Sequence, residues 1–456
     1  EYFIHGDLHL MVMLWKVVLA CIAQRSAANG GVAQPLDDAL VGIIYRHMLP
    51  AASLAQPNPQ LSDLMWRVMS QLSAFQRFMI YSCWEKQYDS FLLKLAQEKT
   101  KSSVKQILKR VVANAEKRDL IAHQAHFHIC KLCHANPIPA IECMLRDVEI
   151  GFNVNMIQPY VECTNKCPEM TADIIGFVLS RSCAKPPTSN RPFLNQADAL
   201  LAPWLTNLGE FAGRFYKKHP QTDLAGPLNI IVKRINADVP EKAVPGSMPS
   251  KEYKGDSLIR VVFESLMEHM GGLTTVADMN AEQLLCLAGG SRLRTESTSY
   301  GKKEDQARKE KARVALFNAL EGLGLVPVLW FSLSEQRHHF LSEEFSEAHS
   351  GSGGLKLLGL LFDGNHDCFL KLSEFLAQAC NREKYMSLMP PLGQVFRMFE
   401  PALAFMAIRH GLAPFGRSVP KLPAAAEVKK EEAKEEAAAK AEEPKAEAKV
   451  EEAKVE

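Results

Sequence analysis

The sequence lacks the features that mark most membrane proteins and polyanion-binding proteins. Its 456 residues carry a formal net charge of only +1, so charge alone does not predict a partner. The first apolar run, residues 10–23, is shorter than the ~20 residues that cross a bilayer, and Lys16 lies within it. We therefore expect this run to form a buried helix, and we expect no membrane partner.

Runs of strand length that alternate apolar and polar residues are also missing, apart from fragments such as residues 229–232. Apolar residues instead recur at steps of three and four, as between residues 61 and 96. This predicts an all-α protein, and an α-solenoid of antiparallel helix pairs, although no strict sequence repeat is visible. For the aromatic residues of this stretch we expect core packing rather than a stacking platform. They are Trp66, Phe75, Phe78, Tyr81 and Trp84.

Cysteine usage does not indicate a disulfide framework. The eleven cysteines are odd in number and scattered through apolar helical patterns. This favours reduced, buried thiols in a nucleus or cytosol. Because the chain does not begin with Met, we expect it to be part of a longer protein, whose targeting signals would not be visible.

Glycine, proline and charge patterns divide the chain into five expected regions. Two proline-containing segments expected to interrupt helices, residues 50–60 and 185–192, lie inside these regions. Residues 118–184 are predicted to form two helix pairs, joined near residues 136, 153 and 167. The last region has eleven Glu and eight Lys without an apolar stripe, so we expect a disordered or singly helical tail. The five regions are an N-terminal helical segment (1–98), a middle helical-repeat region (99–238), a Pro-rich linker (239–255), a C-terminal helical region (256–420) and the low-complexity Ala/Glu/Lys tail (421–456).

The sharpest chemical motif is a His- and Cys-rich helix. Residues 130–134, CKLCH, fit the haem-attachment spacing, but nothing indicates the exported or mitochondrial context that this chemistry requires. His123, His126, Cys130 and His134 share one side of a helix, yet they span ~16 Å of its axis, too far for one tetrahedral zinc. A zinc site would need further ligands such as Cys163 and Cys167, and we predict a packed helix instead.

Three other patterns also fail as functional sites. Residues 363–374 carry calcium-loop spacing, but Cys368 stands where that loop requires glycine. The glycines at 351–354 lack the spacing and the Lys-Ser/Thr pair of a phosphate-binding loop. His338 and His339 do not form a metalloprotease motif. With no nucleophile–base pair either, we expect no enzymatic activity, no cofactor and no bound metal.

Basic residues give two candidate contact sites. On the helix expected within residues 99–118, lysines recur every four residues, which places them on one face. A solvated face is one interpretation, and contact with RNA or an acidic partner is the other. The charged run at residues 302–313 is the second site. The candidate contacts are Lys101, Lys105, Lys109 and Arg110 in the first set, and Lys302, Lys303, Arg308, Lys309, Lys311 and Arg313 in the second.

Several blocks resemble, in order, the THO complex subunit 2 family. The stretch EQLLCLAGGSRLRTES, at residues 282–297, looks like that family's EQLEAMAGGE-LR-E segment. Residues 280–288 also read as a short amphipathic helix ended by Gly289 and Gly290. Further blocks are KLCHANPIPAIECMLRDVEIGFNVNMIQPYVECTNKC, WLTNLGEFAGRFYKKHPQTDLAGPLNIIVKRI, LVPVLWFSLSEQRHHF and LKLLGLLFDGNHDCFLKLSEFLAQACNREKYMSLMP. The resemblance covers roughly residues 100–412.

The resemblance implies a function that the composition alone does not give. Members of the family are non-enzymatic scaffolds of the THO/TREX assembly, which couples transcription to mRNA processing and nuclear mRNA export. It implies as partners the other THO subunits, a DEAD-box RNA helicase, and mRNA bound directly or through partners, in the nucleus. Family tails are typically basic, whereas this tail is slightly acidic, and only Tyr300-Gly301 matches the family's Gly-Tyr-Phe-Gly element. The alternative is another helical-repeat adaptor, acting in translation initiation or trafficking.

Overall fold

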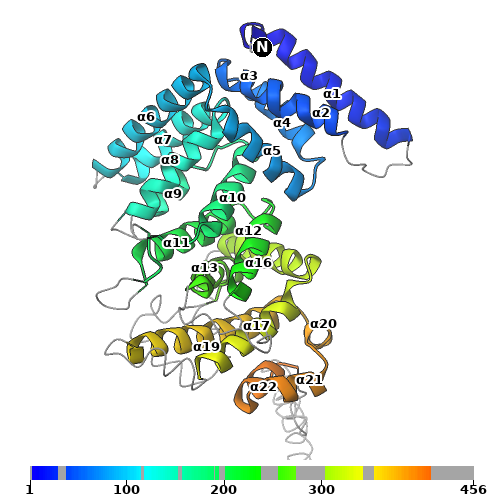
Figure 1. The fold of residues 1–456 in the computed structure, drawn as a ribbon, viewed down its shortest axis with the longest axis vertical. Helices are drawn as coiled ribbons and strands as arrows, with labels where there is room; N and C mark the ends of the chain where they lie inside the picture. Colours follow the sequence, from blue (N-terminus) through cyan, green and yellow to red (C-terminus); the bar gives the residue numbers. More distant parts are fainter. Residues whose placement is uncertain are drawn as a thin grey trace, which may run out of the picture. The chain divides into compact units, whose positions relative to one another are not determined.

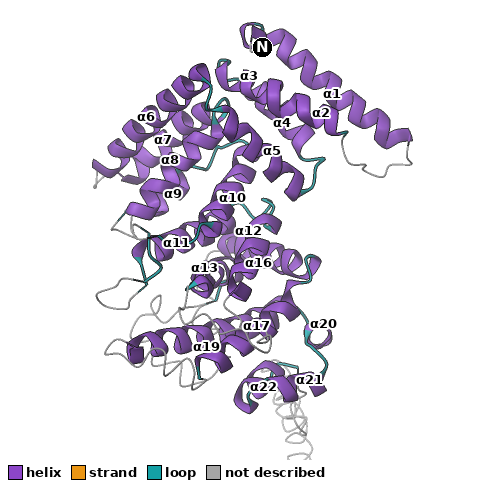
Figure 2. Cartoon of the chain, viewed as in Figure 1, coloured by secondary structure: helices purple, strands orange, loops and turns teal. Residues whose placement is uncertain are grey.

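The described part of the chain is built from helices alone, as the sequence predicts (Figures 1 and 2). The computed structural model describes residues 3–28, 37–113, 118–151, 157–188, 191–194, 201–237, 255–273, 303–341 and 354–411. Within these ranges the only β-structure is two isolated bridges, Thr188 with Arg191 and Leu194 with Leu201. The all-α prediction is confirmed. The predicted linker at 239–255 and the tail at 421–456 lie outside the described residues, apart from Gly255.

Residues Glu1–His410 form one compact unit, which contains nearly every described residue. Its first part comprises η1 (Phe3–Gly6), α1 (Leu8–Ala28), α2 (Asp38–Ile43), the π-helical turn η2 (Ile44–Met48), α3 (Leu49–Leu54), α4 (Pro59–Met69), α5 (Ala74–Gln87) and α6 (Phe91–Ala113). Its middle part comprises α7 (Arg118–Cys133), α8 (Pro137–Ile150), α9 (Ile157–Glu162), α10 (Glu169–Ala184), α11 (Pro203–Lys218) and α12 (Ala225–Ala237). Its last part comprises η5 (Asp256–Ile259), α13 (Arg260–Gly271), α16 (Lys303–Gly322), α17 (Leu325–Phe340), α19 (Gly354–Ala379), α20 (Arg382–Leu388), α21 (Leu392–Met398) and α22 (Pro401–Ile408).

Most helices pack against helices that are close to them in the chain. α6 packs on α7 and α8, α10 on α12, α11 on α13, and α17 on α19 (Figure 1). A continuous core of buried apolar side chains runs through these contacts, from Trp15 in α1 to Ala407 in α22. Contacts between near neighbours are the pattern expected for an array of helix pairs.

Two boundaries in the N-terminal part differ from the sequence-based prediction. The predicted breaker at residues 50–60 begins too early, because Pro50 is the second residue of α3. Proline needs no backbone N–H in a first helical turn, so it is accommodated there. The predicted continuous stretch from 61 to 96 is divided by Ser73, which caps α5 through a capping box with Gln76. That S-x-x-Q signature is visible in the sequence.

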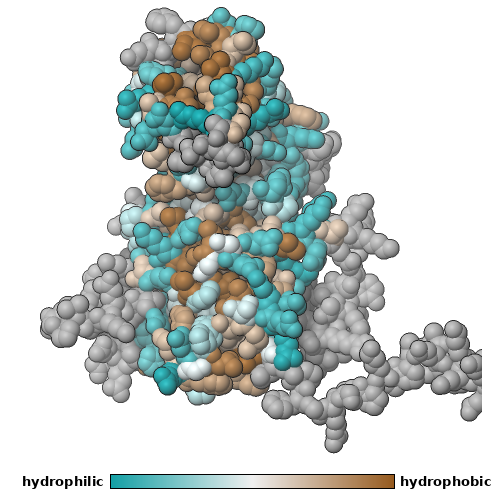
Figure 3. Space-filling model, turned by 90° about the vertical axis from the view of Figure 1, so that its right-hand side faces the viewer, coloured by the Kyte–Doolittle hydropathy of each residue, from teal (hydrophilic) through white to brown (hydrophobic). Residues whose placement is uncertain are grey.

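The apolar helix α1 is buried on one face only. Met11, Trp15 and Val18 are at most 6% exposed and pack toward α4, while Leu10 and Val17 are 45% and 56% exposed. The prediction of a buried helix is therefore only half right. In the described residues, the segment Leu8–Arg25 is long and apolar enough to cross a membrane, a test that core helices and signal sequences also pass. Figure 3 shows apolar surface exposed toward the top of that view.

The aromatic residues of α4 and α5 pack as predicted, with one exception. Tyr81 and Trp84 are completely buried, and Trp66 and Phe78 pack against the core. Phe75 is 80% exposed, because it lies in the first turn of α5 on the side away from α10 and α12. Core packing, rather than a stacking platform, is the role of the other four.

Candidate functional site

The first set of predicted basic residues lies on α6, beside α8. The side chain of Lys101 is 25% exposed and lies 3.8 Å from the carboxylate of Glu98. Lys105, Lys109 and Arg110 are exposed. The α6 backbone is held against α8, where the thiol of Cys143 donates to the carbonyl oxygen of Lys101 over 3.7 Å. The three lysines therefore lie on one continuous helix, which borders a second helix.

Residues of α8 complete this surface, and the sequence did not indicate them. Arg146 is exposed, and Asp147 is partly buried next to it. Burial raises the pKa of Asp147, while Lys105, Arg146 and Lys109 act in the opposite direction. The charges of Lys105 and Lys109 therefore reach α8, although they come from α6. We call Lys101, Lys105, Lys109 and Arg146 the α6–α8 basic surface.

The second set of predicted residues, on α16, has a different environment. Arg308, Lys309 and Lys311 are exposed, while Arg313 forms an ion pair with Glu310 on its own helix. Lys302 lies outside the described residues, and the side chain of Lys303 is not described. α16 packs on α11, α13, α17 and α19, whereas α6 packs on α3, α7 and α8. The structure therefore does not bring the two sets together into one site.

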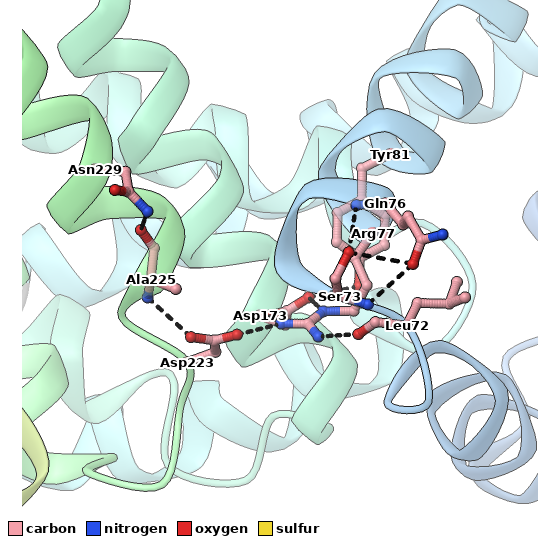
Figure 4. A network of polar contacts seen from close by, with 9 residues as sticks. All are labelled: Leu72, Ser73, Gln76, Arg77, Tyr81, Asp173, Asp223, Ala225 and Asn229. Carbon is pink, nitrogen blue, oxygen red and sulfur yellow. Dashed lines mark hydrogen bonds and ion pairs between the residues drawn. The ribbon is translucent and has the colours of Figure 1, made fainter. Parts of the chain in front are cut away.

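Behind these surfaces, a buried polar network joins α5 to α10 and to the segment before α12 (Figure 4). The guanidinium of Arg77 donates to both oxygens of Asp173 over 2.8 and 3.0 Å, and to Asp223 over 2.7 Å. It also donates to the carbonyl oxygen of Leu72 over 2.7 Å, and the Tyr81 hydroxyl donates to Asp173 over 2.9 Å. The side chains of Arg77 and Asp173 are only 7% and 2% exposed.

The charges of this network compensate each other inside the fold. Burial works against the charge of Arg77, but Asp173 and Asp223 outweigh it and raise the pKa of this guanidinium. Burial raises the pKa of Asp173, and the bonds from Arg77 and Tyr81 oppose that rise. The two-pronged geometry is that of a guanidinium facing an ionised carboxylate. Since Arg77 and Asp173 are almost completely buried, we assign the network to holding α5, α10 and the segment before α12 in place.

The His- and Cys-rich helix is α7, and its polar groups serve packing. Cys130 donates to the carbonyl oxygen of Lys166 over 2.7 Å, and its sulfur lies 3.5 Å from His134 Nε2. His126 and Cys133 are completely buried, and the side chain of His123 is not described. Among the described residues no group of three or more His, Cys, Asp or Glu could hold a metal ion. Residues 363–374 lie within the continuous helix α19, which leaves no calcium loop there.

His219, at the C-terminal end of α11, predicts how stability depends on pH. Burial and the charge of Lys218 lower its pKa from 6.5 to about 4, against the opposing effect of Glu162, and its Nε2 lies 3.4 Å from the Thr164 hydroxyl. The folded chain thus keeps His219 neutral, while the unfolded chain protonates it below about pH 6.5. We expect this group to remove about 2 kcal/mol of stability as the pH falls from 6.5 to 4, allowing for its partial exposure.

Urea unfolding at several pH values measures this effect. His219→Gln should lose less stability than the unchanged chain between pH 6.5 and 4.5. The control is His128→Gln, which replaces an exposed histidine of α7 in the same way. Equal pH dependence in the His219 variant and the unchanged chain would contradict the assignment.

Comparisons with known proteins match two family models to neighbouring regions of the chain. A family model described as "THO complex subunit 2 N-terminus" matches residues 3–118, and one described as "Transcription- and export-related complex subunit" matches residues 129–209. The protein named THO complex subunit 2 from Homo sapiens is 25% identical over 355 residues, covering 77% of this chain and 20% of that protein.

Proteins of the same name from two other organisms also match. The protein of that name from Arabidopsis thaliana is 26% identical over 374 residues, covering 79% of this chain and 18% of its own length. The protein of that name from Saccharomyces cerevisiae is 22% identical over 301 residues, covering 65% of this chain and 17% of its own length. The chain thus spans about a fifth of the length of the curated relatives it matches.

Proposed function

Because this chain belongs to the THO complex subunit 2 family, we propose that it is a non-enzymatic scaffold segment of a THO/TREX-type complex. In this role it couples transcription to mRNA processing and nuclear mRNA export. The observation that carries the proposal is the agreement of two adjoining family models, one of them described as transcription- and export-related, on a chain whose described part is an array of packed helices. Such arrays offer extended surfaces on which other proteins are positioned.

The partners that we propose are the other THO subunits and a DEAD-box RNA helicase, in the nucleus. The exposed cations of α16, Arg308, Lys309 and Lys311, supply electrostatic contacts for one of these proteins. A scaffold changes the cycle of a helicase only by binding its open and closed states unequally. The supporting observation is the combination of long helical surfaces with charges that face solvent.

Two measurements test this proposal. The chain alone should hydrolyse no ATP, and it should change the ATPase rate of the export helicase from the same organism several-fold, since coupling free energies are typically about 1–3 kcal/mol. Tagged protein from nuclei should recover THO subunits. Recovery of translation-initiation or coat factors instead would replace the export function with that of a different helical adaptor.

The role of α16 is tested by one variant. Arg308→Gln/Lys309→Gln/Lys311→Gln should weaken the helicase or subunit complex and reduce its dependence on salt. Lys86→Gln/Lys233→Gln/Arg397→Gln removes the same charge from exposed positions on α5, α12 and α21 and serves as the control. Equal weakening by both variants would show that net charge, rather than this helix, determines binding.

A further inference from the structure

We infer that the α6–α8 basic surface binds the phosphate backbone of single-stranded RNA, independently of base sequence. The surface rests on residues of two helices. Lys101, Lys105 and Lys109 lie on consecutive turns of α6, and Arg146 joins them from α8. The choice of RNA as the polyanion rests on the proposed function, whereas the surface itself does not.

The charge of this surface is mostly uncompensated within the fold. Lys105, Lys109 and Arg146 form no ion pair with any described residue, and Lys101 has only the long contact of 3.8 Å with Glu98. Asp147, a carboxylate of α8 that interacts with Lys105, Lys109 and Arg146, is partly buried. Cations that fold stability does not require remain available to an external anion, and their attraction for it is strongest at low salt.

The spacing of the cations suits a linear polyanion. Lysines four residues apart on a helix are separated by ~6 Å along its axis, so the three lysines form a row of ~12 Å. A nucleic-acid strand presents one phosphate per nucleotide in a similar linear series, and lysine contacts phosphate as a point charge without demanding fixed geometry. Arg146 widens this row on the α8 side, where its planar guanidinium can donate hydrogen bonds to two phosphate oxygens.

The composition of the surface favours a nucleic acid over an acidic protein. Stable protein docking concentrates its affinity in buried aromatic or apolar anchors. Within residues 96–111 of α6 and 137–149 of α8, no large apolar or aromatic side chain is exposed; the exposed ones lie toward the ends of the two helices, at Phe91, Leu92, Leu95, Val112 and Ile150. Recognition of bases would require stacking aromatic side chains or contacts to base edges. We therefore expect this surface to contact only the phosphates and to have no preference for base sequence.

The test is a titration of the full chain against fluorescein-labelled oligouridine at several salt concentrations. Lys105→Gln/Lys109→Gln/Arg146→Gln should weaken binding at least tenfold and lower the slope of log K against log salt by about 2, since each single-strand phosphate contact contributes about 0.7. Asp147→Asn should strengthen binding, because it removes a carboxylate that lies among Lys105, Lys109 and Arg146. The control, Lys86→Gln/Lys233→Gln/Arg397→Gln, removes equal charge elsewhere and should change the affinity less than twofold.

Three outcomes would overturn the inference. The unchanged chain may fail to bind oligouridine, the control may lose as much affinity as the variant, or oligoglutamate of equal charge may compete as well as RNA, which would indicate an acidic protein partner. Recovery of THO subunits is measured with the same variant and should be retained. If the unchanged chain recovers no THO subunits while the titration behaves as expected, the proposed function fails and the RNA surface stands.

Discussion

Replacing Arg77 with methionine is expected to lower the free energy of unfolding by about 3–5 kcal/mol, the usual cost of breaking a buried ion pair by removing one partner. Methionine keeps much of the apolar stem but leaves the carboxylate of Asp173, which is 2% exposed, without its cation. The carbonyl oxygen of Leu72 and the carboxylate of Asp223 lose donors as well. Urea unfolding followed by far-UV circular dichroism measures the loss.

Two controls separate the buried charge from the loss of a side chain. Arg67→Met removes an exposed pair with Asp63, formed over 2.9 Å with both side chains more than half exposed, and should cost less than about 1 kcal/mol. The double variant Arg77→Met/Asp173→Asn should be more stable than Arg77→Met alone, because no unpaired charge then stays buried. If Arg77→Met and Arg67→Met cost the same, the network does not hold the helices together.

Adding a single methyl group at Gly213 should have the next largest effect. A Cβ atom there would lie 2.6 Å from the carbonyl oxygen of Ser265 and 2.5 Å from a ring carbon of His269, both on α13. The backbone oxygen cannot rotate away, so α11 and α13 must separate along their contact. We expect Gly213→Ala to cost about 2–3 kcal/mol, despite the higher helix propensity of alanine.

Gly359→Ala in α19 is the matched control for this prediction. A Cβ at Gly359 meets nothing within 4 Å, so only the backbone effect remains, and stability should rise by about 0.5–1 kcal/mol. Thermal unfolding of both variants provides the comparison. A neutral Gly213→Ala variant would mean that α11 and α13 adjust to each other more freely than their packing indicates.

Local features of this fold could be predicted because neighbouring residues cause them. The helical spacing, the joints near residues 136 and 167, and the lysine row of α6 all depend on residues within about ten positions of each other. At Pro50 the prediction was wrong. Proline interrupts the interior of a helix, but it is also suitable for the first turn of a helix, which is where it lies in α3. The sequence contains the capping-box signature at Ser73, but the continuous apolar pattern around it favoured one long helix instead of two.

Contacts between distant residues could not be predicted, because nothing local requires them. Arg77 meets Asp173 and Asp223 across 96 and 146 positions, and a lone arginine in an amphipathic helix ordinarily faces solvent. Arg146 likewise joins the lysine row only because α8 packs beside α6. For the His- and Cys-rich segment the sequence predicted a packed helix, but it could not indicate particular acceptors such as the carbonyl oxygen of Lys166, because these depend on the turn after α9.

The separation between Arg77 and its partners also sets a waiting time during synthesis. A ribosome adds about 5–20 residues per second, so the 146 positions between Arg77 and Asp223 take roughly 7–30 s to translate. Until Asp173 has been added, 96 positions and roughly 5–20 s after Arg77, α5 can form its capping box with Ser73, but the Arg77 guanidinium has neither carboxylate to bind. Nascent chains halted before residue 173 should therefore expose α5 to protease, and chains that extend past residue 223 should protect it.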